Sequence, residues 1–371
     1  MTADKHFTYK GSGVDVAAGN EAVRLLKERL RSIHHPLVLE GIGGFGGLMR
    51  VPPIKDAVLV AGTDGAGTKV ILAREMGAYD TIGIDAVAMS VNDVSACGAV
   101  PLFFLDYLVL GRIEPQKVAD IVAGVDEGCL RAQCVLLGGE TAEHPGHFKD
   151  DESFDLAGFA VGIASRSELW GPARVEPGDA LIGIASNGLH ANGFSLVRAL
   201  LAERCIALDA PFAPDGAPAG GAADGAPASA GAPAPDATVG DVLLTPTTIY
   251  SPVLHDLGHA CAVHAAAHIT GGGFPDNVGR ILPDGTAAVL DLSAWRPPAV
   301  FAWLHRLGVA VDEMLSTFNC GLGMVLALPA DSVPKALLTI ARAGLQATVV
   351  GEVIGLEPGA RLVRYKGELA L

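Results

Sequence analysis

The segment Gly62-Thr63-Asp64-Gly65-Ala66-Gly67-Thr68-Lys69 constrains the fold of this chain more than any other stretch. It follows a short apolar run, residues 57–61, and precedes a helix-like sequence, so it predicts a turn from a strand into a helix. Glycines let the backbone approach a ligand, and free N–H groups at a helix start favour anions. Asp64 and Lys69 in one turn suggest a metal-bridged phosphate. The alternative is a glycine turn with two solvated charges. The order Thr68-Lys69 is the reverse of that in a Walker A loop.

Strands and helices alternate after this turn. We expect helices over 85–98 and 115–132, and strands over 101–110, 134–137, 154–164 and 180–185, with a further amphipathic helix over 21–32. This alternation indicates α/β or α+β layers rather than a sandwich or a helix bundle. A length of 371 residues allows two domains. We place their boundary within residues 170–178, which gives domains 1–170 and 171–371.

The composition excludes several classes of function. Half of the residues are hydrophobic, 18% are charged, and the formal net charge is −15 with a pI near 5.1. This charge argues against non-specific binding of nucleic acid and against anionic membrane surfaces. No secretory leader and no apolar run long enough to span a bilayer are visible, so we expect a soluble cytoplasmic protein. The six cysteines form no Cys-x-x-Cys pair, and we expect buried free thiols.

Two segments are too poor in large side chains to form a helix or a strand. Five of the residues 41–47 are glycines: Gly41, Gly43, Gly44, Gly46 and Gly47. This segment is either a flexible lid or a loop that lies against a bulky ligand, and we favour the lid. Residues 209–236 are almost entirely Ala, Pro, Gly and Asp, with Phe212 as the only large apolar residue. We expect a disordered surface insertion there.

The helix over 85–98 carries one strongly polar pair, Asn92-Asp93, in an apolar sequence. A carboxylate on such a helix is costly to bury unless it is paired or bound to metal. Asp64 and Asp93 together would form a hard-oxygen site suited to Mg²⁺ that carries nucleotide phosphates. A cap or an ion-pair partner is the alternative for Asp93.

Two later strands also end in polar turns. Glu140 and Thr141 follow the strand over 134–137, and the carboxyl ends of strands are where open α/β sheets bind ligands. His190 and Asn192 follow the strand over 180–185, where a histidine can shuttle a proton or donate a hydrogen bond to developing charge. The alternative is that Asn192 caps the next helix and His190 is exposed. The turns 268–274 and 317–323 offer small donors suited to phosphate or sugar oxygens, and we assign Cys320 to packing.

Nine ordered motifs resemble the phosphoribosylformylglycinamidine cyclo-ligase family, the aminoimidazole ribonucleotide synthetases. They are Ser12-Gly-Val-Asp15, the 43–47 loop, Thr63-Asp-Gly-x-Gly-Thr-Lys69, Asn92-Asp93, Gly138-Gly-Glu-Thr-Ala-Glu143, Gly188-Leu-His-x-Asn-Gly-x-Ser-Leu-Val-Arg198, Leu244-Thr-Pro-Thr247, His268-Ile-Thr-Gly-Gly-Gly273 and Phe318-Asn-Cys-Gly-x-Gly323. The resemblance covers nearly the whole chain except the 209–236 insertion. His144 stands where the family commonly has Met, and Thr248 where it commonly has Arg.

The resemblance implies a fold and a reaction. It implies two α/β domains, the first of which contributes strands to a β-barrel across a homodimer, with ATP in a cleft between dimer and domain elements. It implies that formylglycinamidine ribonucleotide and ATP give aminoimidazole ribonucleotide, ADP and phosphate. The formyl amide oxygen accepts the phosphoryl group, and the ribose-bearing amidine nitrogen then closes the ring.

The resemblance also implies roles for residues. Asp64 and Asp93 would hold Mg²⁺, and Lys69 would neutralise phosphate charge. His190 and Asn192 would contact the reacting or phosphate groups. The remaining nucleotide-site residues would be the lid glycines Gly43, Gly44, Gly46 and Gly47, the turn residues Gly65, Gly67 and Thr68, and the cleft residues Asn92, Glu140 and Thr141.

Enzymes of related architecture are the competing interpretations. Selenophosphate synthetase has a reactive Cys or selenocysteine near its start, whereas the first cysteine here is Cys97. A hydrogenase-maturation protein ends in a reactive Cys, whereas this chain ends in Leu371. Thiamine monophosphate kinase and the longer upstream amidotransferase are further relatives. A non-catalytic nucleotide-binding protein is the alternative of another class, and intact Asp64, Lys69 and Asp93 argue against it.

Overall fold

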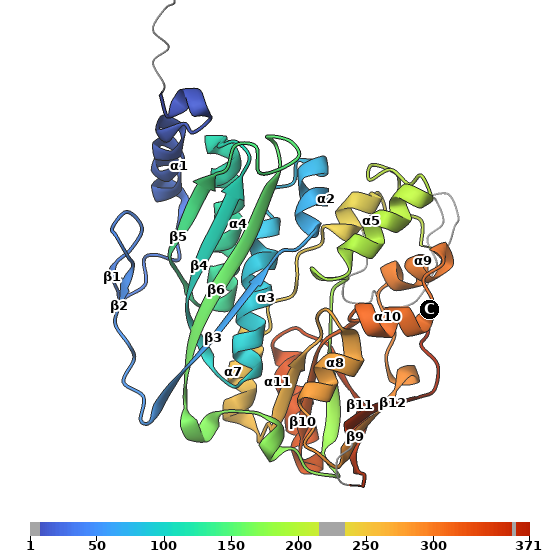
Figure 1. Ribbon diagram of the computed structural model, residues 1–371. Coiled ribbons are helices and arrows are strands. Elements are labelled where there is room, and N and C mark those ends of the chain that lie inside the picture. Colours follow the sequence, from blue (N-terminus) through green and yellow to red (C-terminus); the bar gives the residue numbers. More distant parts are fainter. Residues whose placement is uncertain (1–7, 215–233, 358–360) are drawn as a thin grey trace, which may run out of the picture.

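The computed structural model describes residues 8–214, 234–357 and 361–371 (Figure 1). The first half holds a four-stranded sheet of order β3-β6-β4-β5 and a separate antiparallel pair, β1-β2. Its elements are α1 (Val16–Arg29), β1 (Val38–Glu40), β2 (Leu48–Met49), β3 (Ala57–Gly65), α2 (Lys69–Met76), α3 (Ile82–Ala96), β4 (Val100–Leu110), α4 (Pro115–Ala132), β5 (Val135–Glu143) and β6 (Phe154–Ser165).

The second half holds a six-stranded sheet of order β12-β9-β11-β7-β10-β8, in which only β9 and β12 pair in parallel among the described residues. Its elements are β7 (Ala180–Ala185), α5 (Phe194–Glu203), α6 (Val239–Leu243), α7 (Ser251–Ala260), β8 (Ala265–His268), α8 (Gly273–Arg280), β9 (Thr286–Asp291), α9 (Ala299–Leu307), α10 (Val311–Thr317), β10 (Leu322–Leu328), α11 (Val333–Arg342), β11 (Ala347–Gly355) and β12 (Arg361–Lys366).

This layered arrangement of sheets and helices confirms the expected mixed α/β class. The two sheets lie on either side of the boundary that we place at 170/171, and that division of the chain stays a prediction. Most of the expected insertion, residues 215–233, lies outside the described residues. Within residues 8–214, 234–357 and 361–371, no helix is long and apolar enough to cross a membrane.

Several element boundaries differ from expectation. Helix α3 runs over Ile82–Ala96 rather than 85–98, and α1 ends at Arg29 rather than at residue 32. Two further differences have a clear local reason. Helix α1 begins at Val16 rather than near residue 21, because the Asp15 side chain accepts hydrogen bonds from the N–H groups of Ala17 and Ala18. Strand β5 continues past Leu137 to Glu143, because its residues keep pairing with β4 as far as Leu110. Glu140 and Thr141 therefore lie within a strand.

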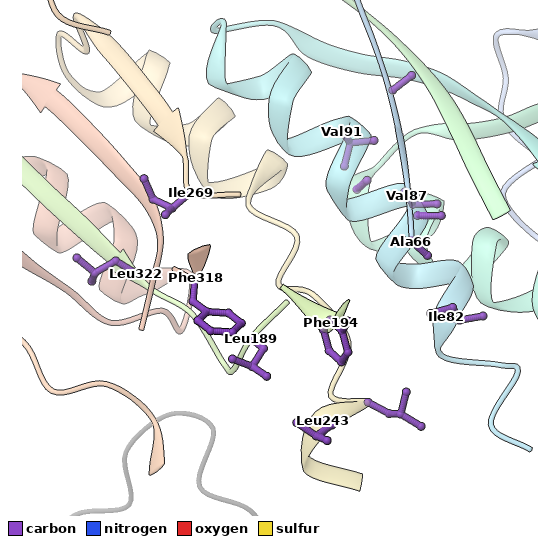
Figure 2. Packing of buried hydrophobic residues seen from close by; sticks show 14 of the residues in the cluster. Ala66, Ile82, Val87, Val91, Leu189, Phe194, Leu243, Ile269, Phe318 and Leu322 are labelled. Atoms are coloured by element: carbon purple, nitrogen blue, oxygen red, sulfur yellow. The ribbon is translucent and has the colours of Figure 1, made fainter. Parts of the chain in front are cut away.

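Helix α3 joins the two halves. Almost all of its residues are buried, and one continuous hydrophobic cluster includes Val87 and Val91 of α3 and residues of the second half. Figure 2 shows these α3 side chains at one end of the cluster and Leu189, Phe318 and Leu322 at the other. The boundary between the halves is thus a packed core.

The cysteine expectation is correct in part. All six cysteines are free, and Cys129, Cys134 and Cys320 are buried. Cys97 and Cys205 are exposed, because each follows the end of a helix rather than facing the core.

Candidate functional site

The 62–69 segment forms the expected turn from strand to helix. Strand β3 ends at Gly65 and α2 begins at Lys69, with Gly67 and Thr68 exposed between them. Asp64 is partly buried, and its Oδ1 accepts a hydrogen bond of 2.8 Å from the N–H of Gly65. Burial raises the pKa of Asp64, and the negative charge of Asp93 raises it further. The two predicted metal-binding carboxylates therefore lie close enough to influence each other.

Asp93 is held by a residue from the other half of the chain. Its Oδ1 lies 2.8 Å from Nδ1 of His268, at the end of β8, and half of the Asp93 side chain stays exposed. Both residues line a cavity of about 310 Å³ between the halves, together with Asn277 and Arg280. Gly62 of β3, two residues before Asp64, also lines this cavity.

The two carboxylates fit a Mg²⁺ ion that arrives with a nucleotide. Within the described parts of the chain, no group of three or more His, Cys, Asp or Glu side chains could hold a metal. Mg²⁺ is commonly bound by one or two carboxylates together with substrate phosphates, and it keeps several waters. The donor set of Asp64 and Asp93 matches that pattern and does not match a closed structural metal site.

Asn92 is fully buried and clamps the segment between α6 and α7. Its Oδ1 accepts a hydrogen bond of 2.8 Å from the Tyr250 N–H, and its Nδ2 donates one of 2.9 Å to the Thr248 carbonyl. The amide oxygen and nitrogen of Asn92 are therefore already hydrogen-bonded within the protein. Asn92 thus joins the two halves, and its expected place in the nucleotide cleft stays a prediction.

Lys69 is also fully buried, with its side chain 0% exposed. Its Nζ donates to Asp85 Oδ1 at 3.0 Å, to the His190 carbonyl at 3.0 Å and to the Thr245 carbonyl at 2.7 Å. Burial lowers the pKa of Lys69 and raises that of Asp85, but three acceptors around one ammonium group match its three protons. The geometry does not support the predicted phosphate contact of Lys69.

His190 is buried, which excludes the alternative of an exposed histidine. Burial lowers the pKa of its imidazole well below the ordinary value, and both ring nitrogens have no hydrogen-bond partner among the described residues. A neutral ring can donate from one nitrogen and accept at the other. Both ring nitrogens of His190 are therefore available to hydrogen-bond a ligand, at a buried position with little access for water.

Asn192 is not a helix cap. The N-cap of α5 is Gly193, which has φ 78°, and no side chain caps it. A Cβ built on Gly271, in the turn after β8, would lie 3.7 Å from Nδ2 of Asn192. Asn192 thus faces the glycine turn that leads into α8.

Glu140 and Thr141 do not join the Asp64 group within one chain. Asp64 pairs with Gly158 on β6, Gly158 with Asp106 on β4, and Asp106 with Gly139 on β5. Residues in register share a face of the sheet and their neighbours point to the other face, so Glu140 lies on the face opposite to Asp64. The strands β3 and β5 are also the two edges of the sheet, roughly 14 Å apart at the usual strand spacing.

The lid glycines likewise lie beside β5. Gly43, Gly44, Gly46 and Gly47 connect β1 to β2, and Phe45 between them is fully exposed. Gly47 packs against Leu137 of β5 so closely that a Cβ would lie 2.4 Å from the Leu137 carbonyl oxygen. Figure 1 shows this hairpin on the side of the sheet away from α2. Within one chain, the hairpin does not cover the Asp64 turn.

Sequence reasoning gave no role to the side chains of Asp85, Thr247 and His268, although Thr247 and His268 stand in two of the nine motifs. The available signal for Asp85 was its spacing of seven from Asn92, because positions i and i+7 share one face of a helix. The partners of Asp85 come from Thr247, 162 positions away, whose N–H and Oγ1 lie 2.8 and 2.6 Å from Asp85 Oδ1. No local pattern indicates such a contact.

Comparisons with known proteins assign the family. The family models described as "AIR synthase related protein, N-terminal domain" and "AIR synthase related protein, C-terminal domain" match residues 46–164 and 176–362. A phosphoribosylformylglycinamidine cyclo-ligase of Magnetococcus marinus is 46% identical over 361 residues, which are 96% of each chain. One of Geotalea uraniireducens is 42% identical over 97% of this chain and 99% of its own.

This chain belongs to the phosphoribosylformylglycinamidine cyclo-ligase family.

Solved structures with this family's fold include more distant enzymes. The chain is similar to a thiamine-monophosphate kinase from Stenotrophomonas maltophilia, with a TM-score of 0.62, 18% identity and coverage of 94% of this chain and 97% of that one. It is similar to the hydrogenase maturation protein HypE in complex with ATP, with a TM-score of 0.59, 17% identity and coverage of 92% and 90%. At these identities, the likeness concerns the fold.

The two departures from the cyclo-ligase family lie in different surroundings. Thr248 is engaged through its carbonyl by Asn92, so its main chain joins the halves. His144 lies after β5, where its N–H donates to the Leu110 carbonyl and its ring contacts that of His147 edge to face. We expect the His144 side chain to have no role in the reaction.

Proposed function

We propose that this chain catalyses the ATP-dependent cyclisation of formylglycinamidine ribonucleotide to aminoimidazole ribonucleotide, with release of ADP and phosphate, in the cytoplasm. The names of the two relatives that align over nearly their full length support the reaction. The observation that carries the assignment to this site is the pair of carboxylates, Asp64 and Asp93, beside a glycine turn and an interdomain cavity.

The carboxylates of this pair would hold Mg²⁺, which neutralises phosphate charge when it is bound with ATP. Asp64 would stay ionised there despite the raised pKa, because a bound cation favours the charged carboxylate. His268 orients Asp93 from the second half, so the site needs both halves in place. Lys69 is left out of the phosphate-binding set because its three protons are already donated.

His190 and Asn192 would contact the reacting groups of the substrate. The reaction transfers a phosphoryl group to the formyl amide oxygen, and the amidine nitrogen then bonds to the formyl carbon as phosphate leaves. A buried neutral imidazole can hydrogen-bond to the oxygen or the nitrogen on which charge changes, and exclusion of water strengthens that bond. The glycine turns after β3 and β8 offer backbone N–H groups for phosphate oxygens.

We include a homodimer in the proposal. The helices α3 and α4 pack behind the four-stranded sheet in Figure 1, and its outer face leaves Leu59, Tyr107 and Phe159 exposed by 63, 45 and 41%. Apolar side chains gathered on one open sheet face are typical of an interface. A second copy on this face would form the intersubunit barrel, and would bring Glu140, Thr141 and the 43–47 hairpin of one subunit toward the nucleotide of the other.

The proposal is tested by incubating the purified protein with formylglycinamidine ribonucleotide, ATP and Mg²⁺. We expect one aminoimidazole ribonucleotide and one phosphate for each ATP consumed. Phosphate release without the imidazole product would assign another acceptor. A folded protein that binds ATP without turnover would support the non-catalytic alternative.

A further inference from the structure

Lys69 and Asp85 form an ion pair that reaches into two loops of the second half. Both side chains are 0% exposed, and Nζ lies 3.0 and 2.9 Å from the two carboxylate oxygens. The remaining donors of Lys69 go to the carbonyls of His190 and Thr245. Asp85 accepts from the N–H and the hydroxyl of Thr247. The pair thus connects α2 and α3 to both loops.

One of these loops presents His190 in an unusual backbone conformation. His190 has φ 64°, in the left-handed region of backbone conformation that residues other than glycine rarely adopt. Such a conformation persists only where its surroundings hold it, and the Lys69 ammonium group binds the carbonyl of this very residue. The carbonyl carbon and the Cβ of His190 are bonded to the same Cα, so moving the carbonyl would also rotate the His190 side chain.

The His190 ring is confined as closely as its backbone. A Cβ on Gly323 would lie 2.6 Å from Cε1 of His190 and 2.1 Å from the Tyr250 hydroxyl. Tyr250 is fixed in turn, because its hydroxyl donates to the Ala185 carbonyl at 2.8 Å. Two buried ring nitrogens without partners among the described residues are costly to keep, so their cost indicates a function that uses them.

We propose that Lys69 and Asp85 are positioning residues that hold His190 in its reactive orientation through its carbonyl, without touching the nucleotide. This inference rests on the proposed function, in which His190 contacts the reacting groups. It predicts that removal of the pair lowers kcat and leaves the binding of ATP unchanged.

The decisive variant is the full-length double substitution Lys69→Met and Asp85→Asn. It removes both charges together, because a single substitution would leave one charge buried without a partner. The amide oxygen that Asp85→Asn introduces can still accept from Thr247, while the His190 carbonyl loses its donor. We expect kcat to fall about tenfold or more, while the Kd of Mg·ATP, measured by calorimetry, stays within about twofold.

A second readout reports on His190 without turnover. In protein labelled with ¹³C at histidine Cε1, the His190 signal is assigned by its loss in His190→Gln. We expect this signal to shift in the double variant. Lys117→Met is the matched control, because Lys117 is also buried but binds the Glu152 carbonyl, within the first half. This control lowers thermal stability and leaves kcat and the His190 signal unchanged.

Three results would overturn the inference. A tenfold rise in the Kd of Mg·ATP would make Lys69 a phosphate ligand. An unchanged kcat, or an unchanged His190 signal, would show that the pair positions nothing. If the double variant does not fold, Thr247→Val takes its place. This substitution removes one hydrogen bond to Asp85 and should lower kcat about threefold, while the Kd of Mg·ATP stays unchanged. A wild-type protein that makes no imidazole product would defeat the proposed function, while the His190 signal would still test the positioning.

Discussion

Asp106 of β4 is a buried carboxyl group that none of the described lysines or arginines pairs with. It lies against β5 so closely that a Cβ on Gly139 would be 1.9 Å from its Oδ1. Burial raises the pKa of Asp106 from 3.8 to about 7, and Glu140 adds to this effect. At the scale of the residue, ionisation of Asp106 opposes folding.

The sign of this effect predicts a pH dependence. Between pH 4 and 7 the folded state binds more protons at Asp106 than the unfolded state, so stability falls as the pH rises through this window. Asp106→Asn removes the dependence. The variant should resemble the wild type at pH 4 and be more stable above pH 7, by roughly 4 kcal/mol at most. Urea unfolding at both pH values measures this. An equal difference at the two values would contradict it.

Asp64 supplies the second prediction at this scale. Asp64→Asn keeps the hydrogen bond to the Gly65 N–H but removes the charge that would bind Mg²⁺. We expect turnover to fall by about 100-fold or more with unchanged thermal unfolding. Asp56→Asn, an exposed carboxylate just before β3, is the control and should retain activity. Near-normal turnover of Asp64→Asn would show that the metal assignment is wrong.

At the scale of the element, the β1-β2 hairpin comes very close to β5 at Gly47. Gly47 is in contact with Leu137, whereas a Cβ on Gly46 would meet nothing within 4 Å. An added methyl group would therefore clash with Leu137 at Gly47 and meet no neighbour at Gly46. The close contact at Gly47 involves both the carbonyl oxygen and the side chain of Leu137.

We therefore expect Gly47→Ala to release the hairpin and Gly46→Ala to leave it in place. Hydrogen exchange of residues 38–49 measures the difference, and exchange in Gly47→Ala should be faster by about tenfold. If the hairpin covers a nucleotide in the dimer, the KM for ATP also rises in this variant alone. Equal exchange in the two variants would mean that the hairpin is held elsewhere.

At the scale of the whole molecule, the homodimer that we propose uses the outer face of the four-stranded sheet. Leu59→Asp places a charge on that face, where burial against a second copy would cost free energy. We expect sedimentation velocity to show a dimer for the wild type and a monomer for this variant. Leu338→Asp, on α11, is the control, because Leu338 is 51% exposed on another surface. A dimer that survives Leu59→Asp would use a different face.

Local sequence patterns account for most helices and strands of this protein. The helix over 115–132 and the strand over 180–185 have the predicted bounds, and the 62–69 segment is a strand-to-helix turn. Apolar periodicity and glycine punctuation act over a few residues, so a pattern can predict them. The nine ordered motifs also identified the family, because their order and spacing are written in the chain.

Which of these motifs meet depends on how the whole chain folds. Lys69 stands in a phosphate-like turn, yet its partners are the carbonyls of residues 121 and 176 positions away. The motifs predict Glu140 in one cleft with Asp64, yet strand register places it on the opposite face, since one residue along a strand reverses the side chain. Long-range pairing and the parity of a strand depend on the packing of the whole chain, and no local pattern encodes them.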